Sequence, residues 1–226
     1  NAAHRFHALG EPRESVAERR VDRLVILLTP AHAKAGDEAP CGQHVDCREL
    51  LCQHHRMMEH WNEHPADDLD STREHRCRGE SGFCGANRMA RISSVFLHQG
   101  EEPELVGDRG SGTIFFSYCN LGCLYCQNYS ISHIGEGHDV DAAQLAEAML
   151  DLQEQGAHNI NFVTPTHYTA QIIEALVIAV EKGLRIPLVY NCGGYERCEI
   201  VKLLESVFDI YMPDFKYADG AKAERL

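Results

Sequence analysis

The sequence predicts an α/β fold built around a parallel β-sheet, and two features of residues 110–217 support this prediction. Short apolar runs rich in β-branched and aromatic residues alternate in this region with longer segments whose apolar residues recur three or four positions apart. Continuous apolar strands that alternate with helices are typical of a parallel sheet with helices packed outside it and right-handed crossovers. We therefore expect one sheet whose strands all run in the same direction.

The expected strands are short apolar runs bounded by turn residues. The first, Thr113-Ile-Phe-Phe-Ser117, is preceded by Gly110 and Gly112. The chain stops soon after the fourth run and begins with Asn1, so we expect a fragment, or a product truncated at its C-terminus. The fourth strand would then have an uncovered edge. In order, the strands are expected at residues 113–117, 159–163, 187–190 and 209–212.

Three amphipathic helices are expected between these strands. Each has apolar residues at helical spacing on one face, and Gly156 and Gly183 provide stops for the first two. The helices are expected at residues 141–155, with Leu145, Met149 and Leu152 inside, at 169–181, with Ile172, Ile173, Leu176 and Val180 inside, and at 196–207, with Ile200, Leu203 and Leu204 inside.

The chain divides near residue 76 into an N-terminal segment, residues 1–75, and a core, residues 76–226. The first segment carries nine of the fourteen histidines and shows little periodicity. We expect a solvated or poorly ordered segment. The alternative is a zinc site, although the spacing matches no known signature; its ligands would come from Cys41, His44, Cys47, Cys52, His54 and His55.

Charge and composition limit the kinds of partner and the cellular compartment that we expect for this chain. The chain has 34 acidic and 21 basic residues, a net charge of −13, and no block of Lys or Arg. Phosphate binding depends on basic surface, so nucleic acid is not the expected partner. The early apolar run Leu24-Val-Ile-Leu-Leu28 is too short to be a signal core or a membrane span. Ten cysteines without a leader favour free thiols in a reducing compartment, so we expect a cytoplasmic protein.

The most informative motif is the C-x3-C-x2-C triplet formed by Cys119, Cys123 and Cys126. Thiolates select zinc, copper(I) or iron–sulfur clusters, and three are one fewer than a closed four-ligand site uses. Zinc fingers usually have a second ligand pair a dozen or more residues away, whereas the next cysteines here are Cys192 and Cys198. The triplet therefore favours a three-ligand cluster loop, and a structural zinc module remains the alternative.

Polar residues follow each later strand. Thr164-Pro-Thr-His167 comes after the second strand, Asn191-Cys-Gly-Gly-Tyr195 after the third, and Asp214-Phe-Lys216 after the fourth. Because the carboxyl ends of parallel strands meet at one edge of a sheet, these groups should lie on the face that holds the cysteine loop. Polar side chains at successive strand ends indicate a ligand-binding site on that face.

The stretch GSGTIFFSYCNLGCLYCQNYSIS, with an aromatic residue before the third cysteine, resembles the signature of the radical S-adenosylmethionine (radical SAM) superfamily. With QGAHNINFVTPTH, PLVYNCGGYE and YMPDFKY, it is similar to the pyruvate formate-lyase-activating-enzyme-like branch over about residues 80–220. The resemblance implies a partial, TIM-like (βα) barrel that is open on one side. It also implies a [4Fe-4S] cluster on the three cysteines, with S-adenosylmethionine on the fourth iron, and an oxidoreductase that abstracts hydrogen.

The same resemblance implies roles for single residues. Asp214 and Lys216 match a pair that reaches the cofactor carboxylate, and Tyr125 would lie against the adenine. Asn191 would bind ribose or methionine groups, and Gly193 and Gly194 would let the backbone approach the ligand. The superfamily's Gly-Gly-Glu is replaced here by TPTH, so Thr164 and Thr166 are the candidates for the amino group; His167 either faces substrate or packs.

Partners follow from the resemblance as well. The type member of the branch acts on a glycyl residue of a glycyl-radical enzyme, and a flavodoxin- or ferredoxin-like protein would supply the electron. The segment Glu80-Ser-Gly-Phe-Cys-Gly85 matches the end of a lead-in pattern of the family, so Cys77 and Cys84 could be remnants of a second metal site. An inactive fragment that binds a cluster without turnover is a further alternative to an active enzyme.

Overall fold

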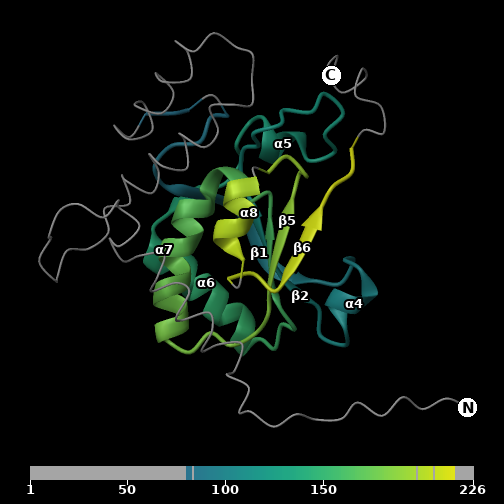
Figure 1. Ribbon diagram of the computed structural model, residues 1–226, viewed down its shortest axis with the longest axis vertical. Coiled ribbons are helices and arrows are strands. Elements are labelled where there is room, and N and C mark those ends of the chain that lie inside the picture. Colours follow the sequence, from purple (N-terminus) through teal and green to yellow (C-terminus); the bar gives the residue numbers. More distant parts are fainter. Residues whose placement is uncertain (1–79, 83, 197, 206, 217–226) are drawn as a thin grey trace, which may run out of the picture.

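The computed structural model describes residues 80–82, 84–196, 198–205 and 207–216. These residues form a mixed six-stranded sheet in the order β3-β1-β2-β4-β5-β6 (Figure 1). The N-terminal segment 1–75 with its Cys/His cluster, and Cys77, lie outside the described residues.

The sheet is open and mostly parallel, which confirms the predicted fold class. Strands β2, β4, β5 and β6 pair in parallel, and β6 is the end strand in the described part of the chain. The four expected strands are therefore parallel, but two further strands were missed: β1 pairs antiparallel with both β2 and β3, so the whole sheet is mixed. The strands are β1 Ala90–His98, β2 Ser111–Phe116, β3 His138–Val140, β4 Ile160–Val163, β5 Leu188–Cys192 and β6 Ile210–Pro213.

The three long amphipathic segments are helical, as predicted. Asp141 caps the first of them: its carboxylate accepts from the N–H of Gln144, whose side chain accepts in turn from the N–H of Asp141. The third helix is shorter than the expected 196–207. The helices are α4 Pro103–Val106, α5 Tyr129–Ser132, α6 Ala142–Glu154, α7 Thr169–Glu181 and α8 Cys198–Leu204, with a 3-10 turn at Thr166–Tyr168.

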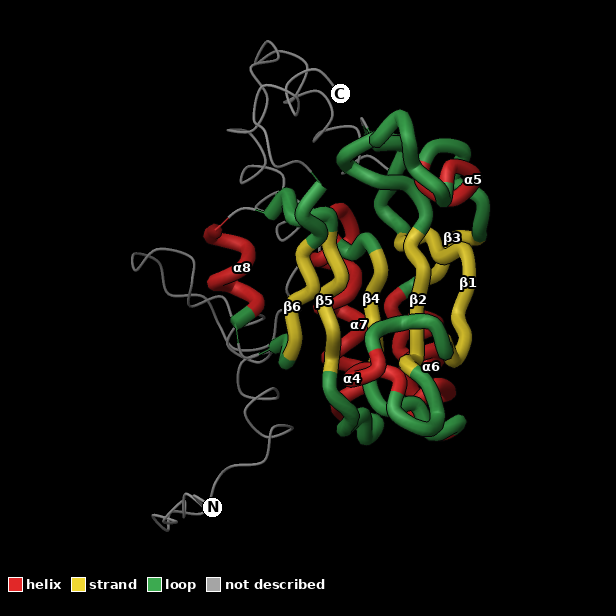
Figure 2. Tube along the Cα trace, turned by 90° about the vertical axis from the view of Figure 1, so that its right-hand side faces the viewer, coloured by secondary structure: helices red, strands yellow, loops and turns green. Residues whose placement is uncertain are grey.

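The core lies between the sheet and the helices. Figure 2 shows α6 and α7 behind the sheet and α4 in front of it. Leu145 and Leu176 are fully buried on facing helices. Aromatic rings continue the core across the sheet: Phe162 stacks on Phe116 at 6.3 Å between centroids and meets Phe208 edge-on at 5.6 Å. This packing fixes the strands, and so the loops that leave their carboxyl ends.

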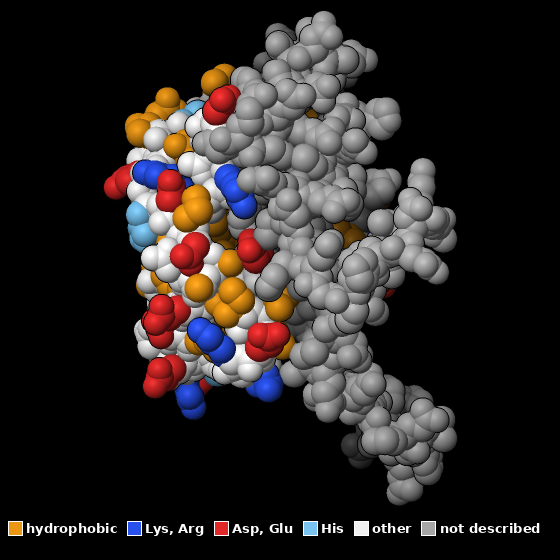
Figure 3. Space-filling view, turned by 90° about the vertical axis from the view of Figure 1, so that its left-hand side faces the viewer, with side chains coloured by type: hydrophobic (Ala, Val, Ile, Leu, Met, Phe, Trp, Pro, Cys, Tyr) orange, Lys and Arg blue, Asp and Glu red, His pale blue; other side chains and the backbone are white. Residues whose placement is uncertain are grey.

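The face that carries α6 and α7 has acidic and basic side chains interspersed (Figure 3). None of the helices within the described ranges combines the length and the apolar character needed to cross a membrane.

Candidate functional site

The cysteine triplet lies in the loop that leaves the carboxyl end of β2. Cys119, Cys123 and Cys126 are all half-buried, and all three line a single cavity of about 400 Å³. The loop is closed by a backbone hydrogen bond of 3.1 Å from the N–H of Cys126 to the carbonyl of Cys123. The fold therefore presents three sulfur ligands to one space.

Hydrogen-bond donors reach two of the three sulfurs. The N–H of Leu121 donates to Cys119 Sγ at 3.4 Å, and the Ser132 hydroxyl of α5 donates to Cys126 Sγ at 3.2 Å. Burial raises the pKa of the Cys119 thiol, and the N–H groups of Leu121 and Gly122 oppose that rise by stabilising the thiolate. Donors of this kind orient and tune cysteine ligands of metal centres.

The three sulfurs are the kind of donor set that an iron–sulfur cluster takes. Across the residues that the structure places, no three Cys, His, Asp or Glu side chains are positioned to hold one metal ion. A [4Fe-4S] cluster does not require such convergence, because each thiolate binds a different iron. Three cysteine thiols that line one cavity fit such a cluster.

The later strand ends bring their polar residues to the same cavity. Thr164 after β4, Asn191 at the end of β5, and Asp214 and Lys216 after β6 all line it, together with Tyr125 of the cysteine loop. Parallel strands that end at one edge explain why residues up to 97 positions apart meet here (119 to 216). The cavity offers these side chains, with the three thiols, to one ligand.

Asp214 and Lys216 are ion-paired at 2.6 Å, and both side chains remain partly exposed. Burial lowers the pKa of Lys216, but the Asp214 carboxylate and the nearby Cys123 and Cys119 outweigh it, so the pKa of Lys216 is raised overall. Lys216 therefore stays cationic beside the thiols.

Two residues of the TPTH segment lie away from the cavity. Thr166 is 2% exposed, and its hydroxyl donates to Glu196 Oε1 at 2.5 Å. His167 is buried as well, with Nε2 2.9 Å from the carbonyl of Ser117 and its ring against Tyr168 at 4.3 Å. Of the two alternatives for His167, the structure shows packing. Thr166 does not join Thr164 at the ligand-facing wall.

A fourth cysteine, Cys192 of β5, also lines the cavity. Burial raises its pKa to about 11; the N–H of Gly194 opposes the rise, and the Glu196 carboxylate adds to it. This raised pKa favours the protonated thiol of Cys192 at neutral pH. Of the other described cysteines, Cys84 is partly buried against the core, and Cys198 is exposed on α8.

Two backbone conformations that shape the site were not predicted. Tyr118 and Thr164 adopt left-handed backbone conformations, with φ of 68° and 60°, at the ends of β2 and β4. Strained residues of this kind persist only where the surroundings hold them. The ring of Tyr118 fills the space beside Gly85 and Gly135, where any Cβ would collide with it. A positive φ at Tyr or Thr cannot be recognised from the sequence. The two glycines can be seen in the sequence, but the residue that packs against them cannot be identified from it.

Gly193 and Gly194 also allow segments of the protein to approach one another. A Cβ on Gly193 would lie 2.5 Å from Leu121 Cδ1, and one on Gly194 would collide with the carbonyl oxygen of Asp214. The two glycines let the β5 loop approach the cysteine loop and the end of β6. Their contacts are with protein atoms that frame the cavity, although Gly193 also lines it.

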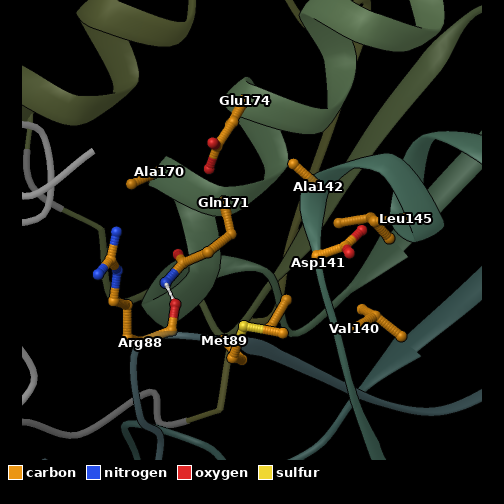
Figure 4. Close-up of a pocket in the computed structure, with 10 residues that line it drawn as sticks. Arg88, Met89, Val140, Asp141, Ala142, Leu145, Ala170, Gln171 and Glu174 are labelled. Carbon is orange, nitrogen blue, oxygen red and sulfur yellow. Dashed lines mark hydrogen bonds between the residues drawn. The ribbon is translucent and has the colours of Figure 1, made fainter. Parts of the chain in front are cut away.

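A second cavity, of about 250 Å³, lies between β1, β3 and the first turns of α6 and α7. Figure 4 shows Gln171 pointing from α7 toward Arg88, whose carbonyl accepts from Gln171 Nε2 at 2.8 Å. Its charged residues are Arg88, Asp141 and Glu174, and no cysteine lines it. The chemistry of the lining therefore identifies the cavity at the cysteine loop as the candidate site.

Comparison with known proteins agrees with this choice. A model of the Radical SAM superfamily matches residues 113–219, which include the cysteine loop and the later strand ends. This match supports the radical SAM superfamily for residues 113–219. A protein of Methanocaldococcus jannaschii named "Uncharacterized protein MJ0674" is 34% identical over 166 residues, which cover 68% of this chain. The chain spans 47% of the length of that relative. No solved structure matches the chain significantly.

The region that matches the superfamily model contains the groups that the cofactors of that superfamily need. Members of the superfamily bind a [4Fe-4S] cluster and S-adenosylmethionine. Cys119, Cys123 and Cys126 would hold three irons, which leaves one iron for an outside ligand. The ammonium of Lys216 and the polar atoms of Thr164 and Asn191 line the same space, as a zwitterionic nucleoside would require.

Proposed function

We propose that this chain is a radical SAM enzyme whose cluster is held by Cys119, Cys123 and Cys126. When bound, the cluster and S-adenosylmethionine supply a 5′-deoxyadenosyl radical that abstracts hydrogen from a substrate. The proposal rests on one observation: the three cysteines line the same cavity as the polar residues that follow β4, β5 and β6. The residues of the chain bind and orient the cofactors and limit the access of water.

The lining residues divide this task by their chemistry. Lys216 is a compact positive charge, suited to the methionine carboxylate, and Asp214 fixes its direction through the 2.6 Å ion pair. Asn191 offers donors and an acceptor to ribose or methionine groups. Thr164 is the remaining candidate for the amino group, because Thr166 is committed to Glu196. Tyr125 presents an aromatic face to the adenine.

We further propose that the enzyme belongs to the activating-enzyme-like branch and acts on a glycyl-radical enzyme. Large apolar side chains stand exposed in the loops that frame the cavity, among them Leu124 at 77% and Phe215 at 86%. Exposed apolar groups around a polar site are typical of a protein-docking surface. A flavodoxin- or ferredoxin-like donor would supply the electron. A glycyl-radical EPR signal on a partner mixed with the reduced enzyme would test this step.

Anaerobic reconstitution with iron and sulfide tests the general function. We expect a brown protein with the absorption and EPR signals of a [4Fe-4S] cluster, and release of 5′-deoxyadenosine after addition of S-adenosylmethionine and a strong reductant. Cys123→Ala should lose the iron. Cys198→Ala, which removes an exposed cysteine outside the cavity, is the matched control and should retain it.

The outcomes separate the alternatives. A colourless, zinc-loaded protein would indicate a structural zinc module. A cluster without any release of 5′-deoxyadenosine would indicate an inactive cluster-binding fragment. Normal iron content in Cys123→Ala would contradict the ligand assignment itself.

A further inference from the structure

A partly buried carboxyl group, that of Glu196, lies in a polar cluster behind the cavity wall. Thr166 donates to Glu196 Oε1 at 2.5 Å, and the Tyr190 hydroxyl donates to Oε2 at 3.4 Å. The Tyr190 hydroxyl is also 3.0 Å from Thr169 Oγ1. The Cys192 thiol hydrogen-bonds to Glu196 as well. The carboxyl group thus binds hydroxyl and thiol groups from two other segments of the chain, the 3-10 turn and β5.

These partners are inside the protein. Thr166, Tyr190 and Cys192 are at most 4% exposed. Removal of the carboxyl group would leave the buried hydroxyls of Thr166 and Tyr190 without that acceptor, which costs free energy. The hydrogen-bonded cluster is therefore an internal part of the site and not a surface contact.

The cluster connects two walls of the cofactor cavity. Thr166 lies two residues beyond Thr164, which lines the cavity. Cys192 lies between Asn191 and Gly193, and these three residues at the end of β5 line the cavity as well. Thr164 has φ of 60° and donates its N–H to the carbonyl of Asn191 at 2.9 Å. A threonine in that conformation needs neighbours to hold it, and Glu196 anchors the loop that follows it.

We infer that Glu196 is a positioning residue for the cofactor cavity: by holding Thr166 and Cys192, it sets the Thr164 and Asn191 walls at the separation that S-adenosylmethionine requires. Glu196 itself does not line the cavity, so it acts through these neighbours. The inference deepens the proposed function and rests on it.

The test measures the Kd of S-adenosylmethionine for the full chain after anaerobic reconstitution, together with iron content and Tm. Glu196→Ala should raise the Kd about tenfold or more, as expected when hydrogen-bonded positioning is lost, while iron per chain is unchanged. Glu196→Gln keeps an acceptor for Thr166 and should stay within about threefold of the wild type. Glu174→Ala, which removes a carboxylate of α7 outside this cavity, is the matched control.

Thr166→Val provides an independent variant if Glu196→Ala folds poorly. It should raise the Kd to a similar extent, and the double variant should be little worse than either single one, because both remove one linked interaction. If Glu196 had a purely structural role, its variants would lower the Tm. The effects of the two substitutions on the Kd would then not be coupled, and Glu196→Gln would not restore the affinity.

Each outcome has a clear meaning. Wild-type affinity in Glu196→Ala or Thr166→Val, or an equal loss in Glu196→Gln and Glu196→Ala, would overturn the inference alone. If the reconstituted wild type does not bind S-adenosylmethionine, the proposed function fails and the inference fails with it.

Discussion

Gly194 is the position where one added methyl group should disturb the site most. Its φ of 76° lies in the left-handed region, and a Cβ there would collide with the carbonyl oxygen of Asp214. The obstacle is backbone and not the end of a flexible side chain. Relief therefore requires that the β5 loop and the end of β6 move apart, although the N–H of Asp214 is bonded to the carbonyl of Cys192 at 3.0 Å.

The magnitude of Gly194→Ala has two parts. The left-handed conformation costs about 1–2 kcal/mol for a residue with a Cβ, partly offset by the lower entropy of the unfolded chain. Forcing an extra methyl into a packed contact adds about 1–3 kcal/mol. The sum is about 2–4 kcal/mol of unfolding free energy, or a Tm lower by about 10 °C for a chain of this size.

Gly183→Ala separates the two parts. Gly183 has φ of 105° beyond α7, but a Cβ there meets no atom within 4 Å. It should therefore show only the backbone cost, a Tm lower by about 3 °C, with unchanged affinity for S-adenosylmethionine. Thermal unfolding and cofactor binding of both reconstituted variants are the assays. Equal Tm values for Gly183→Ala and Gly194→Ala would refute the reasoning.

The periodic part of the fold was predictable from sequence. The helix expected at 169–181 is α7, Thr169–Glu181, because its apolar stripe packs on the sheet as the spacing requires. Strand β1 was missed because its sequence, ARISSVFLH, mixes polar and apolar residues and pairs antiparallel between two neighbours. Strand β3 has three residues, too few for any pattern.

The cavity lining was predictable for a different reason. In a parallel sheet, every strand end reaches the same edge, so polar residues after successive strands meet whatever their spacing in sequence. The hydrogen bonds that hold those lining residues in place were not predictable. Glu196 follows Tyr195 in a loop. Nothing in the sequence indicates that its carboxyl group accepts a hydrogen bond from Thr166, 30 residues earlier. Thr166 was expected beside Thr164, but the 3-10 turn directs it inward.

The remaining predictions concern the packing of the core and the carboxyl group of Glu196. Leu145→Ala, at a fully buried position of α6, should lower the unfolding free energy by about 2–5 kcal/mol, measured by thermal unfolding; a shift under about 2 °C would contradict the packing. Burial raises the pKa of Glu196, although hydrogen bonds from Thr166, Cys192 and Tyr190 oppose the rise. A raised pKa means that the folded protein holds this proton more tightly than the unfolded chain, so the resulting stability is complete below the ordinary carboxyl pKa and is lost as pH rises through the raised value. Glu196→Gln cannot ionise, and its Tm should therefore fall less than that of the wild type between about pH 5 and about pH 8. Parallel Tm curves for the two proteins over that interval would show that Glu196 ionises as easily in the fold as outside it.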